Sequence, residues 1–127
     1  MILLTTNTQF PKRGEIWLVN FDPTVGAEMK KIRPAVIISS DTVGKLPIKL
    51  VAPITDWKPY FAQNIWHVKI AADISNGLTK DSAVDSLQLR GVDLQRFIRK
   101  IGSVSDSQLL SILVAIVTII EADQYEK

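Results

Sequence analysis

The sequence contains no cysteine and only one histidine, His67, among its 127 residues. Without thiols the chain has neither disulfides nor thiolate metal ligands, and a single imidazole is too few for a histidine-cluster metal site. Oxygen ligands alone still permit a site for a hard cation. We expect no metal and no cofactor.

Long hydrophobic runs are also lacking. The longest apolar stretch, residues 109–120, is interrupted by Ser111 and Thr118 and falls short of the roughly 20 residues that span a bilayer. The first ten residues lack a basic segment followed by a long apolar run, so no secretory signal is expected. The length predicts a single domain over residues 1–127, cytoplasmic and without membrane contact.

Positive and negative side chains nearly balance, since the net charge is only +2, and the pI is near 9.0. This balance permits nucleic-acid binding without demonstrating it. The positive side chains gather in two stretches: Lys30, Lys31 and Arg33, and then Arg90, Arg96, Arg99 and Lys100. Solvated surface charge is the ordinary interpretation of either stretch taken alone.

What the chain does have is a series of short segments typical of β-strands. Their β-branched and aromatic content, or their alternation of apolar and polar residues, predicts strands at residues 16–21, 35–39, 48–55, 64–70, 82–90 and 97–104. Polar loops separate them, and this spacing predicts a small β-barrel. Trp17 and Trp66 fall within predicted strands and are expected in the core.

The C-terminal segment is predicted to be a helix. Ser105 and Gln108 have the spacing of a capping box, and apolar residues at helical spacing follow. Further apolar residues occupy the other side, among them Leu110, Val114 and Ile119. A single barrel covers only one face of a helix, so these three residues are predicted to form a dimer interface.

Several short motifs occur in a fixed order over most of the chain. They are RGEIW (13–17), DPTVGAE (22–28), RPAVIIS (33–39), APIT (52–55) and QLR (88–90), followed by Asp93 and Arg96. In this order and spacing they resemble the MazF/PemK toxin family. The resemblance implies a mainly β fold with a C-terminal α-helix, namely an SH3-like antiparallel β-barrel of the MazF/PemK/CcdB type, acting as a homodimer. It also implies sequence-specific, metal-independent cleavage of single-stranded mRNA, and inhibition by a small, partly disordered antitoxin.

The resemblance places the catalytic residues at Arg33 and Thr55. Metal-independent cleavage uses the 2′-hydroxyl of the RNA as nucleophile, so the protein must accept a proton and stabilise negative charge on the phosphoryl oxygens. A guanidinium suits the second task, because it stays charged and offers forked donors to phosphate. The Thr55 hydroxyl is too weak an acid to act as the base, and its expected role is to bind a phosphoryl oxygen or to orient Arg33.

The proton acceptor is left open. Glu28 is a candidate for the base or for an organiser of its loop, and it could equally pair with Lys30 or Lys31. His67 has a suitable unperturbed pKa, but a histidine in the middle of a strand is more often structural, so it is kept out of the catalytic set.

RNA binding is assigned to cationic, polar and aromatic residues of the loops, types that hold phosphates and stack on unpaired bases. The predicted set is Thr24, Lys30, Lys31, Trp57, Lys58, Tyr60, Gln88 and Arg90. Several family members carry an acidic residue directly before the motif glutamine, where this chain has Leu87. That difference bears on cleavage specificity, unless Asp85 supplies the missing carboxylate.

Two alternatives remain open. A toxin of the CcdB type shares the fold and poisons DNA gyrase, and fold alone does not separate the two activities. A catalytically inactive, SH3-like interaction module is the other. Arg33 and Thr55 have no purpose in a gyrase poison, and an interaction module should tolerate the loss of the Arg33 guanidinium.

Overall fold

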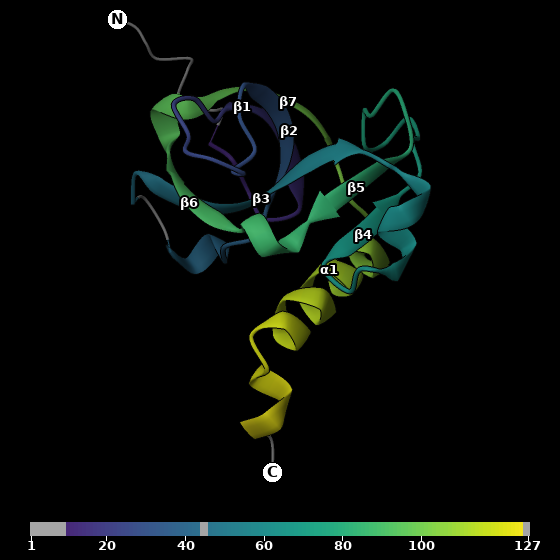
Figure 1. The fold of residues 1–127 in the computed structure, drawn as a ribbon. Helices are drawn as coiled ribbons and strands as arrows, with labels where there is room; N and C mark the ends of the chain where they lie inside the picture. Colours follow the sequence, from purple (N-terminus) through teal and green to yellow (C-terminus); the bar gives the residue numbers. More distant parts are fainter. Residues whose placement is uncertain (1–9, 44–45, 126–127) are drawn as a thin grey trace, which may run out of the picture.

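The computed structural model describes residues 10–43 and 46–125. Its strands, in chain order, are β1 (Glu15–Asn20), β2 (Ile32–Ile37), β3 (Ile48–Asp56), β4 (His67–Ile70), β5 (Ser82–Asp85), β6 (Arg90–Asp93) and β7 (Phe97–Ser103). One α-helix, α1 (Asp106–Ile119), follows them (Figure 1). Short 3-10 turns lie between the strands, namely η2 (Asp41–Val43), η3 (Pro59–Gln63), η4 (Ser86–Gln88) and η5 (Leu94–Arg96), and a further one, η6 (Ala122–Tyr125), follows α1.

All strand pairings in the described ranges are antiparallel, and the long strand β3 organises them. The order is β4-β5-β3-β2-β1-β7, with β6 paired to the first half of β3. β3 pairs with β6 through residues 48–51, with β2 through residues 51–53 and with β5 through residues 54–56. The sheet curls strongly (Figure 1), yet β6 and β7 are not paired with each other, so its hydrogen-bonded path stays open. The predicted mainly β fold with a C-terminal helix is confirmed.

Alternating side chains of the sheet enter two separate cores, as the period of a strand requires. One core contains Trp17, Val19, Phe21, Ala35, Ile37, Val51 and Val92. The other contains Ile16, Val36, Ile38, Ala52, Ile54, Ile70, Val84 and Ile112, and thus includes a residue of α1. The prediction that Trp17 is a core residue is confirmed.

Helix α1 begins at the predicted capping box. The Ser105 hydroxyl accepts from the Gln108 amide at 3.1 Å, and the Gln108 side chain accepts from the Ser105 amide at 2.8 Å. The helix buries Ile112 against the sheet but leaves Leu110 61% and Val114 56% exposed, whereas Ile119 is half-buried. In the part of the chain that the structure describes, no helix has the length and apolarity to cross a membrane.

Three predicted strands differ from the structure. The segment 35–39 is shifted, since β2 covers residues 32–37. The segment 82–90 is broken by η4, because the Asp85 carboxylate accepts from the Leu87 amide and turns the chain before β6 begins. The segment 64–70 becomes a strand only at His67, since η3 and a following turn occupy residues 59–66. Trp66 lies in that turn and is half-buried, so its prediction as a core residue was wrong.

Candidate functional site

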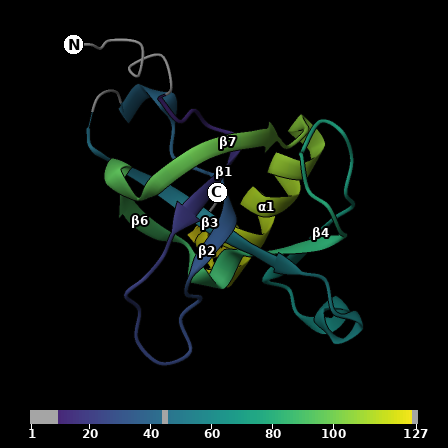
Figure 2. The ribbon, with the colours of Figure 1, turned by 90° about the horizontal axis from the view of Figure 1, so that it is seen from above.

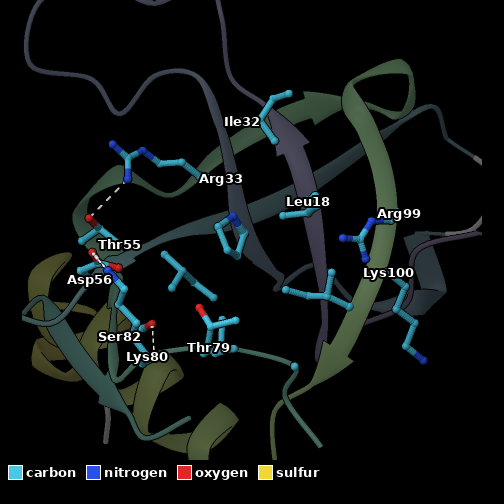
Figure 3. A pocket seen from close by; sticks show the side chains of 15 residues that line it. Leu18, Ile32, Arg33, Thr55, Asp56, Thr79, Lys80, Ser82, Arg99 and Lys100 are labelled. Atoms are coloured by element: carbon cyan, nitrogen blue, oxygen red, sulfur yellow. Dashed lines mark hydrogen bonds and ion pairs between the residues drawn. The ribbon is translucent and has the colours of Figure 1, made fainter. Parts of the chain in front are cut away.

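Arg33 and Thr55 meet across neighbouring strands. The antiparallel register pairs Ala35 of β2 with Pro53 of β3, and two residues further along each strand lie Arg33 and Thr55. The Arg33 Nη1 donates to Thr55 Oγ1 at 3.4 Å (Figure 3). The Arg33 Nε donates to the Lys30 carbonyl at 3.1 Å. The structure therefore brings together the two residues predicted to be catalytic, one of them tied to the β1–β2 loop.

Both residues line a cavity of about 470 Å³. Its apolar lining comes from Leu18, Ile32, Pro34, Ile54, Leu78 and Ile101. Its charged lining comes from Arg33, Asp56, Lys80, Arg99 and Lys100, with hydroxyls from Thr55, Thr79 and Ser82 (Figure 3). Cations therefore outnumber carboxylates around an apolar floor, an arrangement suited to a phosphate attached to a flat base.

Two of these cations are already paired. Lys80 Nζ lies 3.4 Å from the Asp56 carboxylate, and Lys100 Nζ lies 3.1 Å from Glu15. Among the described residues, Arg99 forms no ion pair. Leu18 of β1 pairs with Pro34 of β2 on one side and with Arg99 of β7 on the other, so these three residues form one row across the sheet. Its guanidinium is available to an anion in the cavity.

Sequence reasoning did not assign Asp56, Lys80, Arg99 or Lys100 to the site. Arg99 and Lys100 belong to the second basic stretch, and that clustering was the available signal. Lys80 lies in the loop between β4 and β5, where no local pattern marks it. The long-range packing of that loop beside β3 and β7 assembles the set.

The β1–β2 loop is held by its own polar side chains. Glu28 accepts from the Val25 amide at 2.8 Å, and Asp22 accepts from the Lys31 amide at 2.8 Å. Arg96 donates to the carbonyl of Asn20 at 3.0 Å and to that of Asp22 at 2.6 Å. Figure 2 shows this loop projecting beyond the strands. Thr24, Lys30 and Lys31 all lie on it, the two lysines exposed and Thr24 half-buried.

A second cavity, of about 540 Å³, lies where this loop meets η4. It is lined by Ala27, Glu28, Leu87, Gln88, Leu89 and Arg90. Glu28, Gln88 and Arg90 thus line a different cavity from Arg33 and Thr55. Among the described residues, Glu28 forms no ion pair with Lys30 or Lys31. The Arg90 guanidinium stacks over the Phe21 ring with 5.6 Å to its centroid.

The predicted aromatic binding residues gather around Phe61 and line neither cavity. Trp57 and Tyr60 meet the Phe61 ring edge-on, at centroid distances of 5.8 and 4.9 Å. Lys69 lies 5.3 Å from the Trp57 ring, which is half-buried. Tyr60 is 69% exposed, and Lys58 is exposed beside it. Tyr60 is thus the ring with a face open to a base.

His67 is held in a structural environment. Its ring stacks on Phe61 at 3.8 Å, its Nδ1 lies 3.1 Å from the Asn64 amide nitrogen, and its Nε2 lies 3.8 Å from the Asp85 carboxylate. Burial lowers the pKa of His67 below its ordinary value, while the neighbouring Asp85 opposes that shift. This arrangement favours a neutral imidazole that organises the turn.

Comparison with known families decides the affiliation of the chain. The family model described as "PemK-like, MazF-like toxin of type II toxin-antitoxin system" matches residues 12–120. The chain belongs to this family. Within residues 10–43 and 46–125, histidine and carboxylate side chains form no group of three or more that could hold a metal ion.

Curated relatives of this PemK-like, MazF-like toxin are endoribonucleases by name. Endoribonuclease MazF9 of Mycobacterium tuberculosis is 32% identical over 104 residues, covering 77% of this chain and 86% of the relative. Endoribonuclease MazF of Staphylococcus epidermidis is 34% identical over 102 residues, covering 80% and 83%. Endoribonuclease EndoA of Bacillus subtilis is 32% identical over 99 residues, covering 77% and 84%.

Solved structures establish the fold. MazF from Deinococcus radiodurans superposes with a TM-score of 0.75 at 18% identity, covering 87% of this chain and 96% of that one. A mycobacterial endoribonuclease in complex with its cognate antitoxin superposes with a TM-score of 0.67 at 15% identity, covering 88% and 96%. The predicted MazF-like fold is confirmed.

Proposed function

We propose that this toxin is an endoribonuclease that cuts single-stranded RNA, without a metal, by attack of the 2′-hydroxyl on the adjacent phosphorus. The observation that carries the proposal is the Arg33–Thr55 contact in the lining of a cavity that has more cations than carboxylates. The endoribonuclease names of the curated relatives support the same reaction.

In this mechanism Arg33 and Thr55 act on the phosphoryl group. The 2′-oxygen forms a bond to phosphorus as the bond to the 5′-oxygen breaks, which leaves a 2′,3′-cyclic phosphate and a free 5′-hydroxyl. Negative charge rises on the non-bridging oxygens, and the Arg33 guanidinium stabilises it there. The Thr55 hydroxyl, which orients Arg33 in the free protein, donates to one of the same oxygens.

Asp56 and Lys80 are the candidates for proton transfer. Asp56 follows Thr55 directly on β3 and is the carboxylate in the cavity lining, and Lys80 lies 3.4 Å from it. The carboxylate accepts the 2′-proton, and the ammonium supplies a proton to the departing 5′-oxygen. Glu28 lies in the other cavity and holds the Val25 amide, which favours the role of loop organiser over that of base.

RNA lies across the loops that border the two cavities. The β1–β2 loop supplies Thr24, Lys30 and Lys31, the segment after β3 supplies Trp57, Lys58 and Tyr60, and the second cavity supplies Arg90. We add Arg99, which lines the same cavity as Arg33, as a second phosphate contact. Cations for phosphates and an open aromatic face for bases are the means by which proteins bind single strands.

The protein acts in the cytoplasm, as a homodimer that a cognate antitoxin inhibits. The exposed Leu110 and Val114 of α1, with Ile119 beside the buried face, form the proposed contact with the second copy. A related MazF structure is a MazE–MazF complex. An acidic antitoxin segment would be attracted to the cations that border the RNA cavity.

The test is cleavage of a long single-stranded RNA in excess EDTA by the purified wild type and by Arg33→Ala. We expect discrete fragments with cyclic-phosphate ends from the wild type alone. Intact RNA with a folded wild type would overturn the ribonuclease function. Inhibition of gyrase supercoiling without RNA cleavage would establish the CcdB-like alternative, and retained growth inhibition by Arg33→Ala would favour an interaction module.

A further inference from the structure

Both polar atoms of the Gln88 side chain are engaged within the protein. Its Oε1 accepts from the Met29 amide of the β1–β2 loop at 2.6 Å. Its Nε2 donates to the Asp85 carboxylate at 3.0 Å. A base could reach this amide only through its second N–H or the second lone pair of its oxygen, since the first of each is used within the protein.

Asp85 is a firm anchor for this arrangement. It is 6% exposed, its other oxygen accepts from the Leu87 amide at 3.1 Å, and the His67 Nε2 lies 3.8 Å away. A buried carboxylate with several donors holds a fixed orientation, because each lost donor leaves an unsatisfied charge. Gln88 is thus held by a rigid partner on one side and contacts the loop on the other.

The loop in turn holds the catalytic arginine. Met29 directly precedes Lys30, whose carbonyl accepts from the Arg33 Nε at 3.1 Å. A continuous path therefore runs from Asp85 through Gln88 and the Met29–Lys30 backbone to the guanidinium. Arg33 can use its Nη atoms on phosphate while this contact fixes its Nε.

We propose that the Asp85–Gln88 pair is a positioning device, which fixes the β1–β2 loop and through it the orientation of Arg33. The inference rests on the proposed ribonuclease function. It assigns Gln88 an indirect effect on cleavage, in place of the direct RNA contact predicted from the sequence. Misplacement of a catalytic group by about 1 Å costs up to roughly 100-fold in rate.

The polarity of the two bonds supplies a sharp test. In Gln88→Glu two carboxylates face each other, and in Asp85→Asn the amide can no longer accept from both Leu87 and Gln88, so either variant breaks the pair. In the double variant D85N/Q88E, the asparagine amide donates to the glutamate, and the glutamate still accepts from Met29. The original geometry is restored with its donor and acceptor exchanged.

The first readout is hydrogen exchange at the Met29 amide, which does not depend on activity. We expect its protection to fall at least tenfold in each single variant and to return in the double variant. Gln95→Glu is the charge-matched control, because Gln95 is exposed and outside both cavities. It should leave Met29 protected.

The second readout separates positioning from binding. Each single variant should lose about tenfold or more in the rate of single-turnover cleavage, with RNA affinity within about threefold of wild type. The double variant should recover the rate. A loss of affinity that persists in D85N/Q88E would overturn the inference in favour of direct RNA contact, as would unchanged Met29 exchange in folded single variants.

The two proposals fail separately. If the wild type does not cleave RNA, the ribonuclease function falls, while Met29 exchange still decides whether the pair fixes the loop. Thermal unfolding of each variant checks that the native state persists. The variant Leu87→Ala serves as a further comparison, since the Leu87 side chain is exposed and the variant keeps the backbone amide that donates to Asp85.

Discussion

The Arg33 guanidinium contacts the Thr55 hydroxyl at 3.4 Å, across the seam between β2 and β3. That distance is long for a hydrogen bond, so the bond is weak. A phosphoryl oxygen that entered the cavity would replace it with a shorter, charge-assisted bond at little cost. In the free protein the contact orients Arg33 without competing strongly with the substrate.

The first prediction concerns the geometry of this cation. Arg33→Lys keeps the charge but loses the fork that holds the Lys30 carbonyl and the phosphate together, so we expect the rate constant of the cleavage step to fall about 100-fold or more. Single-turnover cleavage measures it. Arg13→Lys is the control, because Arg13 lines neither cavity. Activity of Arg33→Lys within threefold of wild type would show that charge alone suffices.

Arg99 should make a phosphate contact. Arg99→Gln is expected to weaken RNA binding uniformly across sequences and to reduce the slope of log affinity against log salt by about 0.7, the share of one counterion for a single strand. Titrations at several salt concentrations measure the slope. Lys12→Gln, a change of the same charge outside both cavities, should leave it unchanged. An Arg99→Gln slope equal to that of wild type would remove Arg99 from the RNA path.

Tyr60 should stack on an unpaired base. Loss of one aromatic platform costs about 1–3 kcal/mol per base, so Tyr60→Ala is expected to weaken RNA affinity by about fivefold or more. Fluorescence anisotropy with a short labelled RNA measures this change. Tyr125→Ala is the matched control, since Tyr125 is also exposed but lies at the C-terminal end of the described chain. Equal affinities of the two variants would reject the stacking role.

The exposed stripe of α1 should bind a second copy. A carboxylate in an apolar interface is desolvated without a partner, so Val114→Asp is expected to convert the dimer to a monomer. Analytical ultracentrifugation measures the change. Ile74→Asp introduces the same charge at a fully exposed apolar residue in the β4–β5 loop and should leave the dimer intact. A Val114→Asp dimer would place the interface elsewhere.

His67 should make stability depend on pH. Because burial lowers its pKa below the ordinary 6.5, the folded state binds fewer protons than the unfolded state just below that pH. The stability it contributes is therefore complete above about 6.5 and declines as pH falls toward the folded-state pKa. Denaturant unfolding at several pH values measures the slope. In His67→Gln this slope should disappear, and a slope that persisted would assign it to other groups.

Much of this protein follows from local patterns in its sequence. The strand segments β1 to β3 are marked by runs of β-branched residues, and the start of α1 by Ser105 and Gln108, whose capping contacts involve near neighbours. Arg33 and Thr55 were predicted as site residues from the motifs RPAVIIS and APIT. The exposed Leu110 and Val114 were expected because a helix that is apolar all round exceeds what one sheet can cover.

The tertiary structure alone decided which side chains share a cavity. Asp56, Lys80 and Arg99 come from β3, the β4–β5 loop and β7, and only the long-range pairing of β3 with β5 and of β1 with β7 brings them beside Arg33. It also decided that the predicted strand 82–90 breaks after Asp85, whose carboxylate accepts from the Leu87 amide and caps the turn η4. Local sequence carries the propensity of each segment, whereas the register between distant strands determines which groups meet.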